Sequence, residues 1–477
     1  MKIKIPKNTD PLVRKEFAVI NQGFFENFEF VCDDADLEFA AQINDSHTNS
    51  ITKNEILKAY FLFLTDKTGI HPPWGLLNGM RPNKLVHSMK KNGLSDLEIR
   101  DRLRDDYLVS PAKTELLLTV LNEQFSSIPD LHEIDNEVSI YIGIPFCPTR
   151  CAYCTFAAYA HRPNQRWVEP VMAALYQEIK LVGAYLKREN IKVTTIYLGG
   201  GTPTSLSAPE LESLLDVIES EITPFANLRE ITVEAGRPDT LDEEKLALLK
   251  KYNIERISIN PQSFHQKTLD SIGRHHSVEE VLVQYKQAQA LGIKNVNMDL
   301  IVGLPGEETG ELTYSLDQIK NMQPASLTVH MLAFKRKSEL TKSRGLYTLA
   351  SKDVLTEMAQ MTYEFAAEND YRPYYLYRQK NIAANLENIG YAKPGNSCLY
   401  NILMMEEAQN ILGLGVGSSS KFLIGESVHN PKDLRTYIEN YEQYAQKKLE
   451  LLILSRRIAA KSFVYNENTL EDLDETL

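Results

Sequence analysis

The stretch that decides the fold covers residues 139–154 and reads SIYIGIPFCPTRCAYC. Residues 139–144 form an apolar run that predicts a buried strand, and three of the chain's five cysteines follow closely: Cys147, Cys151 and Cys154. Cysteine is the usual ligand of iron–sulfur clusters, so three thiolates on one short loop can bind three corners of a [4Fe–4S] cubane. The fourth iron then has no protein ligand and keeps an open coordination position. In zinc proteins, by analogy, an open position distinguishes catalytic sites from structural ones.

A zinc site and a disulfide are the alternative interpretations of this cysteine loop. A tetrahedral zinc site needs a fourth ligand, and His161 lies too far along the chain to be the obvious one. A disulfide would leave one of the three cysteines unpaired, and the five cysteines show no pairing pattern. The cysteine content therefore favours a reducing compartment, as an oxygen-labile cluster requires.

Length and composition are those of an ordinary globular protein. The chain has 477 residues, enough for two or three domains, with 43% hydrophobic and 24% charged residues. It contains no apolar run of the ~18 residues that a membrane span needs, and its first residues lack the apolar core of a signal peptide. The net charge is −12 without a long basic run, which disfavours nucleic acid as a partner. We therefore expect a cytoplasmic protein.

We divide the chain into an N-terminal accessory domain (1–135), a core (136–340) and a C-terminal substrate-covering region (341–477). The first region predicts a small α/β domain, with strands near its start and helices at 51–65, 96–107 and 113–125. Ser95 and Glu98 form a capping box before the second of these helices. No catalytic motif occurs there, so a packing or substrate-shaping role is expected.

In the core, apolar runs alternate with helical segments. The runs that predict strands are 139–144, 194–198, 230–234, 255–259, 296–302 and 326–332. Capping boxes at Ser207 with Glu210 and at Thr240 with Glu243 mark two of the intervening helices. Each interval admits a crossover helix, so the strands should be parallel. Six β/α units are too few for the closed eight-unit barrel, so we expect an α/β fold with an open or partial (β/α)6 barrel.

Candidate site residues fall where the predicted strands end. Ligands of parallel β/α folds gather at the carboxyl ends of the strands. The cysteine loop follows the first strand, and the run from Gly199 to Pro203 follows the second. Glu234 ends the third strand, Gln262 follows the fourth, and Asp299 lies inside the fifth. The glycine run can also be a tight turn, and Asp299 can also be a salt-bridged core residue.

The cysteine loop and the glycine run resemble those of the radical S-adenosylmethionine (SAM) superfamily. In detail the chain resembles the oxygen-independent coproporphyrinogen III oxidase family, and most of all its coproporphyrinogen dehydrogenase branch, which has an extra N-terminal domain. The residues that carry this resemblance are Tyr141, Ile144–Cys147, Gly199–Thr204, Glu234, Gln262, Arg274, Asp299–Ile301 and Gly303–Pro305, with the stretches 233–240 and 375–381 for the branch.

The resemblance implies a [4Fe–4S] cluster on the three cysteines and SAM on its open iron. The residues implied to contact that SAM are Tyr141, Gly200, Glu234 and Ala333. The residues implied to line the adjacent pocket, where the family's founding enzymes hold a second SAM, are Tyr153, Gly201, Thr202, Gln262, Arg274 and Asp299.

The implied reaction is radical decarboxylation of coproporphyrinogen III to protoporphyrinogen IX in haem biosynthesis, with an unidentified electron donor as partner. The sequence assigns no catalytic residue. The substrate carries four carboxylates, and the arginine fork binds carboxylates in a bidentate manner. Arg237, Arg372 and Arg378 are therefore the candidate substrate-binding residues, although the aromatic stretch around the last two can also be an ordinary hairpin.

The chain departs from the family's best-studied branch at two positions. Gly143 stands where that branch has a histidine, and Phe156 stands where it has a fourth cysteine. Phe156 is shared with the family's haem-chaperone branch. The alternative functions are therefore a haem-binding chaperone and a radical SAM enzyme that modifies haem.

Overall fold

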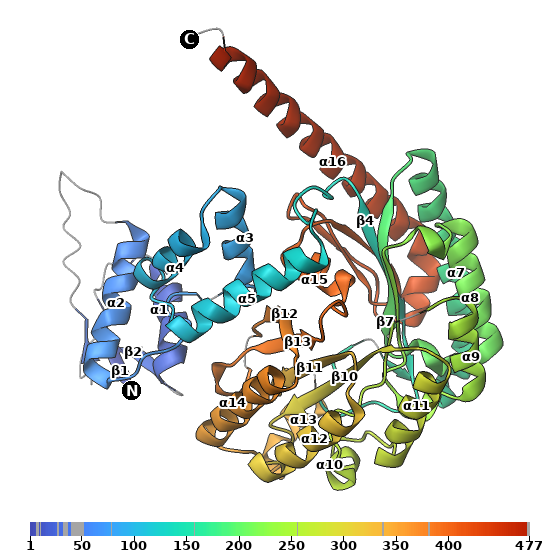
Figure 1. Ribbon diagram of the computed structural model, residues 1–477, viewed down its shortest axis with the longest axis horizontal. Coiled ribbons are helices and arrows are strands. Elements are labelled where there is room, and N and C mark those ends of the chain that lie inside the picture. The colour runs from blue at the N-terminus through green and yellow to red at the C-terminus, as the bar shows by residue number, and fades with distance from the viewer. Residues whose placement is uncertain are drawn as a thin grey trace. The chain divides into compact units, whose positions relative to one another are not determined.

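The computed structural model describes residues 1–5, 9, 11–25, 28–31, 37–39, 52–77, 79–156, 158–254, 256–335, 338–379 and 382–474 (Figure 1). The side chains of 344, 383 and 460–474 lie outside this description. The chain divides into two compact units, which are described separately. One contains Met1–Glu123 and Leu376–Lys380, and the other contains Gln124–Tyr375 and Asn381–Leu477. The predicted division into three functional regions stays a prediction.

The first unit is a small α/β structure, as the sequence predicts. Its parallel sheet has the order β2-β1-β3. The strands are β1 (Lys2–Lys4), β2 (Glu29–Val31) and β3 (Leu37–Glu38), and the helices are α1 (Pro11–Phe24), α2 (Lys53–Thr68), α3 (Asn83–Lys91), α4 (Asp96–Asp105) and the start of α5 (Pro111–Ser127). The Ser95–Glu98 capping box is confirmed, because each side chain accepts a hydrogen bond from the other residue's backbone amide.

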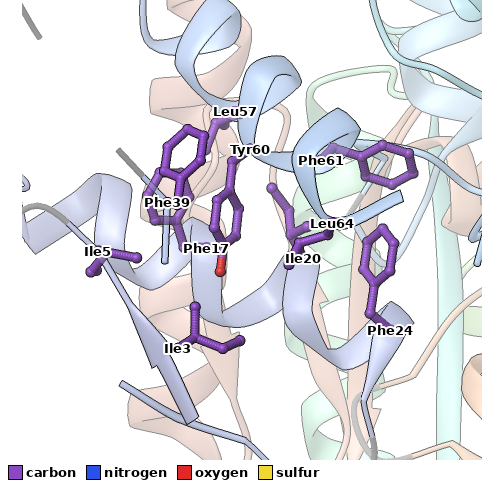
Figure 2. Close-up of a cluster of buried hydrophobic side chains, with 10 residues drawn as sticks. All are labelled: Ile3, Ile5, Phe17, Ile20, Phe24, Phe39, Leu57, Tyr60, Phe61 and Leu64. Carbon is purple, nitrogen blue, oxygen red and sulfur yellow. The ribbon is translucent and has the colours of Figure 1, made fainter. Parts of the chain in front are cut away.

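Aromatic side chains form the core of the first unit (Figure 2). Phe17 of α1 stacks on Tyr60 of α2 with ring centroids 3.9 Å apart, and Phe39 meets both rings edge-on. On α2 the buried residues Leu57, Tyr60, Phe61 and Leu64 recur at helical spacing, so they share one face. The buried Tyr60 hydroxyl donates to Asn21 Oδ1 at 2.9 Å. This face accounts for the unit's stability and carries no sign of chemistry.

The second unit contains an eleven-stranded sheet in the order β12-β13-β11-β10-β9-β8-β7-β4-β14-β15-β16. The six predicted strands are present as β4 (Val138–Ile144), β7 (Val193–Gly200), β8 (Glu230–Glu234), β9 (Arg256–Ser258), β10 (Asn295–Val302) and β11 (Ser326–Met331). Consecutive strands of this set pair in parallel. The predicted partial (β/α)6 barrel is therefore confirmed.

Helices connect these strands and lie along the outside of the sheet (Figure 1). The main crossover helices are α7 (Val168–Arg188), α8 (Ala208–Glu221), α9 (Glu243–Lys251), α11 (Val278–Ala290) and α12 (Thr309–Met322). The Ser207–Glu210 capping box of α8 is confirmed. The predicted cap of α9 is wrong: Asp242 caps that helix, because the Thr240 hydroxyl already donates to the carbonyl of Arg237 in the preceding turn.

The C-terminal region extends both edges of the barrel sheet. On the β11 side it adds β12 (Arg372–Tyr377) and β13 (Asn388–Ala392), and on the β4 side it adds β14 (Asn410–Gly415), β15 (Ser419–Lys421) and β16 (Ser427–His429). Its helices are α14 (Lys352–Glu368), α15 (Leu399–Glu406) and the 41-residue α16 (Leu434–Asp474), which packs on α7. β14 pairs with β4 in parallel, so the C-terminal region is part of the sheet that carries the cysteine loop.

A fully buried ion pair ties this extension to the core. Glu178 of α7 and Lys448 of α16 are both 0% exposed and hydrogen-bonded to each other. The Glu178 carboxylate also accepts from the Gly415 amide at 2.8 Å, the Asn430 amide group at 3.0 Å and the Tyr437 hydroxyl at 2.7 Å. A buried charge is tolerated only when its hydrogen-bonding capacity is met, and four donors meet it here.

We predict that Glu178→Leu destabilises the protein by about 3–5 kcal/mol, because it leaves Lys448 as an unpaired buried cation. Lys448→Met is the matched control and should cost less, since Glu178 keeps three donors. Urea unfolding followed by circular dichroism measures both changes. Equal losses for the two variants would contradict this account of the cluster.

Candidate active site

The cysteine loop is held in place by backbone hydrogen bonds at the carboxyl end of β4. The Gly201 amide donates to the Ile144 carbonyl at 2.7 Å, which joins the glycine run to the start of the loop. Within the loop, the Ala152 amide donates to Ile272 at 2.8 Å, and the Ala152 carbonyl accepts from Leu340 at 2.9 Å. Cys147, Cys151 and Cys154 are free thiols, of which the second is buried and the others are half-buried.

The charges around the three thiols favour a bound, negatively charged group. Burial raises the pKa of Cys147 to about 12 and also raises that of Cys154, so neither thiol ionises readily by itself. Arg237 near Cys147 and Lys335 near Cys154 act in the opposite direction, and Arg274 Nη1 lies 3.9 Å from Cys151 Sγ. Metal binding deprotonates a coordinating thiol outright, and neighbouring cations then stabilise the thiolates.

The donor set fits a cubane better than a single ion. Among the described residues, no three His, Cys, Asp or Glu side chains converge as the ligands of one metal ion would. Three cysteines that each bind a different iron of a cluster need not converge in this way. The three free thiols and the surrounding cations therefore suit a cluster held at three corners.

Two carboxylates at the same end of the sheet have different protonation behaviour. Burial raises the pKa of Glu234 to about 7, against the opposing hydrogen bonds from the Tyr197 hydroxyl and the Gly200 amide. Burial acts on Asp299 too, but its contact with His330 and hydrogen bond from Asn297 outweigh burial and lower its pKa. Asp299 is therefore ionised at neutral pH, whereas Glu234 titrates there.

The glycine run makes room for the Glu234 carboxylate and for the cysteine loop. A Cβ atom on Gly199 would lie 2.8 Å from Glu234 Oε2, and one on Gly201 would lie 2.4 Å from the Phe146 carbonyl oxygen. Gly200 has a φ of +106°, a conformation that favours glycine. The following residue, Thr202, is fully buried, and its hydroxyl donates to the Glu234 carbonyl at 3.3 Å. Glycine is thus required here for close packing of β7 against β8 and the cysteine loop.

Arg274 joins the cysteine loop to the ends of β8 and β9. Its guanidinium donates to the Gly236 carbonyl, to the Asn260 carbonyl at 2.6 Å and to the Tyr153 hydroxyl at 3.4 Å. Gln262 has a φ of +65° and connects to β10 through its backbone, donating to the Asp299 carbonyl at 2.8 Å. The cysteine loop after β4, Glu234 at the end of β8, Gln262 after β9 and Asp299 within β10 therefore lie at one mouth of the barrel.

Comparisons with known proteins bear on this arrangement. The model of the radical SAM superfamily matches residues 141–319. The chain is 46% identical over 419 residues to the oxygen-independent coproporphyrinogen-III oxidase-like protein HemZ of Bacillus subtilis, covering 87% of this chain and 84% of that protein. The chain belongs to the radical SAM family of oxygen-independent coproporphyrinogen III oxidase-like proteins. Radical SAM proteins use a [4Fe–4S] cluster and SAM, and these are its cofactors.

Other members and a solved structure agree with this assignment. The heme chaperone HemW of Escherichia coli is 31% identical over 287 residues, which cover 60% of this chain and 70% of HemW. The solved structure of coproporphyrinogen III oxidase (HemN) from Escherichia coli aligns with a TM-score of 0.53 at 21% identity, covering 68% of this chain and 72% of that one. This likeness shows the shared fold. The family thus includes proteins named as oxidases and proteins named as chaperones.

The candidate substrate arginines have other partners within their units. Arg237 is 3% exposed, and Asp239 accepts two hydrogen bonds from it at 3.0 and 2.8 Å. In the first unit, Arg378 donates to the Leu77 carbonyl and lies over the Trp74 ring. Arg372 is exposed at the start of β12. The role of these three arginines in substrate binding stays a prediction.

Ala333 lies just past β11, 8% exposed and bridged to Ile382, and its predicted SAM contact stays a prediction.

Sequence reasoning missed Tyr197, Asn260 and Tyr400. Tyr197 lies on the same face of β7 as Gly199, so the two-residue period of the strand was the available signal. Tyr400 comes from the C-terminal region and carries no local signal.

In the described part of the chain, no helix is long and apolar enough to cross a membrane.

We predict that replacing Cys147, Cys151 or Cys154 by Ala greatly lowers iron and sulfide content and bleaches the brown cluster chromophore of anaerobically reconstituted protein. Cys398→Ser is the matched control, because Cys398 is a fully buried free thiol whose sulfur donates to Glu230 at 3.3 Å. Full iron content in all three alanine variants would refute the assignment of the cluster ligands.

We predict a pH-dependent effect of Glu234→Gln on stability. The folded pKa of Glu234 is raised from 4.5 to about 7. The stability that the protonated Glu234 contributes is therefore fully present below about pH 4.5 and is lost as the pH rises through about 7. Glutamine resembles the protonated carboxyl and does not titrate. In SAM-free, cluster-loaded protein, the free energy of unfolding of the variant should therefore exceed that of wild type by roughly 1–3 kcal/mol at pH 8 and be similar to it near pH 5. Denaturant titrations at both pH values measure this difference, and a pH-independent difference would contradict it.

Proposed function

We propose that this protein is a radical SAM oxidoreductase that decarboxylates coproporphyrinogen III to protoporphyrinogen IX without oxygen, in the cytoplasm. The observation that carries the proposal is the cysteine loop beside Glu234 and the glycine run, in a chain that shares 46% identity with HemZ over most of both proteins. When bound and reduced, the cluster and SAM supply a 5′-deoxyadenosyl radical. The remaining tasks of binding, orientation and exclusion of water belong to the protein.

The proposed binding roles are those that the resemblance to the family implies. The cysteines hold the cluster. Tyr141, Gly200, Glu234 and Ala333 would contact the cluster-bound SAM, and the Glu234 carboxylate would pair with its ammonium group. Tyr153, Gly201, Thr202, Gln262, Arg274 and Asp299 line the adjacent space, for a second SAM or for the substrate.

Two buried polar atoms at this mouth support a ligand in the adjacent space. Among the described residues, Arg274 Nε and Asn260 Oδ1 lack hydrogen-bond partners. A buried polar atom without a partner costs free energy, so its presence is expected where a ligand completes the hydrogen bonds. One donor and one acceptor thus remain at the end of β9 for a polar ligand.

The proposed reaction balances for each of two propionate groups. A hydrogen atom leaves the β-carbon of the propionate and passes to the 5′ carbon of the deoxyadenosyl radical. The resulting substrate radical then releases CO2 and gives one electron to an unidentified one-electron acceptor, which leaves a vinyl group. Each turnover therefore yields one 5′-deoxyadenosine and one CO2. Cationic side chains, for which Arg237, Arg372 and Arg378 are the candidates, would bind the carboxylates of the tetrapyrrole.

A haem-binding role is the second candidate. It is favoured by the 31% identity to proteins named heme chaperones and by Phe156, which is 63% exposed two residues beyond the last cluster cysteine. An exposed phenylalanine beside the cysteine loop suits contact with a flat apolar macrocycle. In this role the protein would bind haem, and SAM would serve regulation; modification of haem itself is a further variant.

The experiment incubates reconstituted protein anaerobically with SAM, dithionite and coproporphyrinogen III. We expect protoporphyrinogen IX with two equivalents of 5′-deoxyadenosine, and we expect neither product from Cys154→Ala. Chromatography of the oxidised porphyrins and of the nucleosides measures both products. Stoichiometric haem binding without decarboxylation would overturn the oxidase assignment in favour of the second candidate.

A further inference from the structure

Three tyrosines from different elements stack beneath the barrel mouth. Tyr141 of β4, Tyr197 of β7 and Tyr400 at the start of α15 have nearly parallel rings. The Tyr197 centroid lies 4.7 Å from that of Tyr400 and 6.0 Å from that of Tyr141. Tyr141 and Tyr197 are direct neighbours in the parallel register of β4 and β7. The ring of Tyr197 is therefore fixed by contacts with both of the other tyrosines.

The fixed ring directs its hydroxyl at Glu234. The Tyr197 hydroxyl donates to Glu234 Oε1 at 2.5 Å, a short hydrogen bond typical of a charged acceptor. Gly199, two residues beyond Tyr197, leaves the space that the other carboxylate oxygen occupies, since a Cβ there would lie 2.8 Å from Oε2. The Gly200 amide is a further hydrogen-bond donor to this carboxylate. Glu234 is thus clamped entirely by residues of the neighbouring strand.

The C-terminal region buttresses this clamp through Tyr400. The Glu230 carboxylate accepts hydrogen bonds from the backbone amides of Leu399 and Tyr400 at 3.0 and 3.1 Å. A carboxylate at these first amides of α15 satisfies donors that the helix itself leaves free. Glu230 of β8 therefore holds Tyr400 against Tyr197, on the same strand that carries Glu234.

We propose that Tyr197 is a positioning residue that favours the ionised form of the Glu234 carboxylate and aims it at the ammonium group of SAM, with Tyr400 as its buttress. The inference rests on the SAM-binding role of Glu234 proposed above, but not on the identity of the tetrapyrrole. Tyr197 lies on the preceding strand, β7, and its hydrogen bond holds the Glu234 carboxylate in one orientation. The carboxylate is therefore oriented for a cation before SAM binds.

The groups that face Glu234 explain why it needs such a donor. Asp299 of β10 is a negative charge that disfavours ionisation of Glu234, and burial acts in the same direction. Tyr141 and Tyr400 also face it, and burial raises the pKa values of their hydroxyls, so both stay neutral and neither adds a charge. The Tyr197 hydroxyl and the Gly200 amide are the groups that lower the pKa of Glu234. Removing the hydroxyl should therefore raise that pKa above about 7.

The test is Tyr197→Phe in the full-length, cluster-loaded protein, with SAM and dithionite but without tetrapyrrole. Reductive cleavage of SAM is followed as 5′-deoxyadenosine from pH 6 to pH 9, and SAM affinity is measured by equilibrium dialysis. We expect the midpoint of the acid limb to move up by roughly one pH unit, because a hydrogen bond to a charged group is lost. The KM for SAM should rise at pH 7 and return toward the wild-type value at pH 9.

Tyr285→Phe is the matched control. Tyr285 is a buried tyrosine of α11 whose hydroxyl donates to the Met322 carbonyl at 2.7 Å, so it should leave the pH profile unchanged. In a Glu234→Gln background, Tyr197→Phe should produce no shift, because the group that titrates is gone. Tyr400→Leu should give a shift in the same direction as Tyr197→Phe.

Two results would overturn the inference: an unshifted midpoint in Tyr197→Phe, or an equal loss of SAM affinity at every pH. If Tyr197→Phe does not fold, Gly199→Ala tests the same geometry, since its methyl group displaces the Glu234 carboxylate and should also move the midpoint. Failure of the proposed function can be told apart from failure of this inference. If the protein does not decarboxylate coproporphyrinogen, SAM cleavage can still show the pH dependence that tests the role of Tyr197.

Discussion

The second unit depends on one constraint: polar side chains on a buried face of its sheet must find hydrogen-bond partners. β4 alternates Ser139, Tyr141 and Gly143 with three isoleucines that are fully buried. Ser139 is satisfied by Gln409, and it accepts from Thr195 of β7 at 2.9 Å. The parallel register places such residues side by side, so the polar face is a connected network rather than a set of isolated groups.

The same network explains why the site lies at one end of the sheet. Toward the amino ends of the strands the polar groups satisfy one another: Arg256, for example, donates to Asn295, Ser326 and a backbone carbonyl. Toward the carboxyl ends, Glu234 has a raised pKa, and Arg274 keeps a donor without a partner in the described residues. A buried polar atom without a partner costs stability, so the unpaired Arg274 Nε and Asn260 Oδ1 are atoms whose hydrogen bonds a ligand can complete.

The sequence was sufficient to predict the fold of the core and the cofactors, whereas the three cysteines stay predicted as the cluster ligands. Short apolar runs between capped helices predicted all six barrel strands, because crossover helices leave few other topologies. The cysteine spacing predicted the loop, since a cluster needs several thiolates within a short span. The cap of α9 was mispredicted because the hydroxyl of Thr240 has a nearer partner in Arg237. β14 and Tyr400 were not predicted, because their partners lie more than two hundred residues earlier in the chain.

These long-range contacts bring the C-terminal region to the candidate site. Its strand β14 pairs with the strand that precedes the cysteine loop, and its helix α15 supplies the ring that supports Tyr197. Glu178 fixes β14 from the helix side through the Gly415 amide, and Glu230 fixes α15 from the sheet side through the Tyr400 amide. Two carboxylates of the core, the buried Glu178 and the half-buried Glu230, thus hold the C-terminal region in register. Because Tyr400 packs on the tyrosine that donates to Glu234, the orientation of this third carboxylate depends on contacts from both the barrel and its extension.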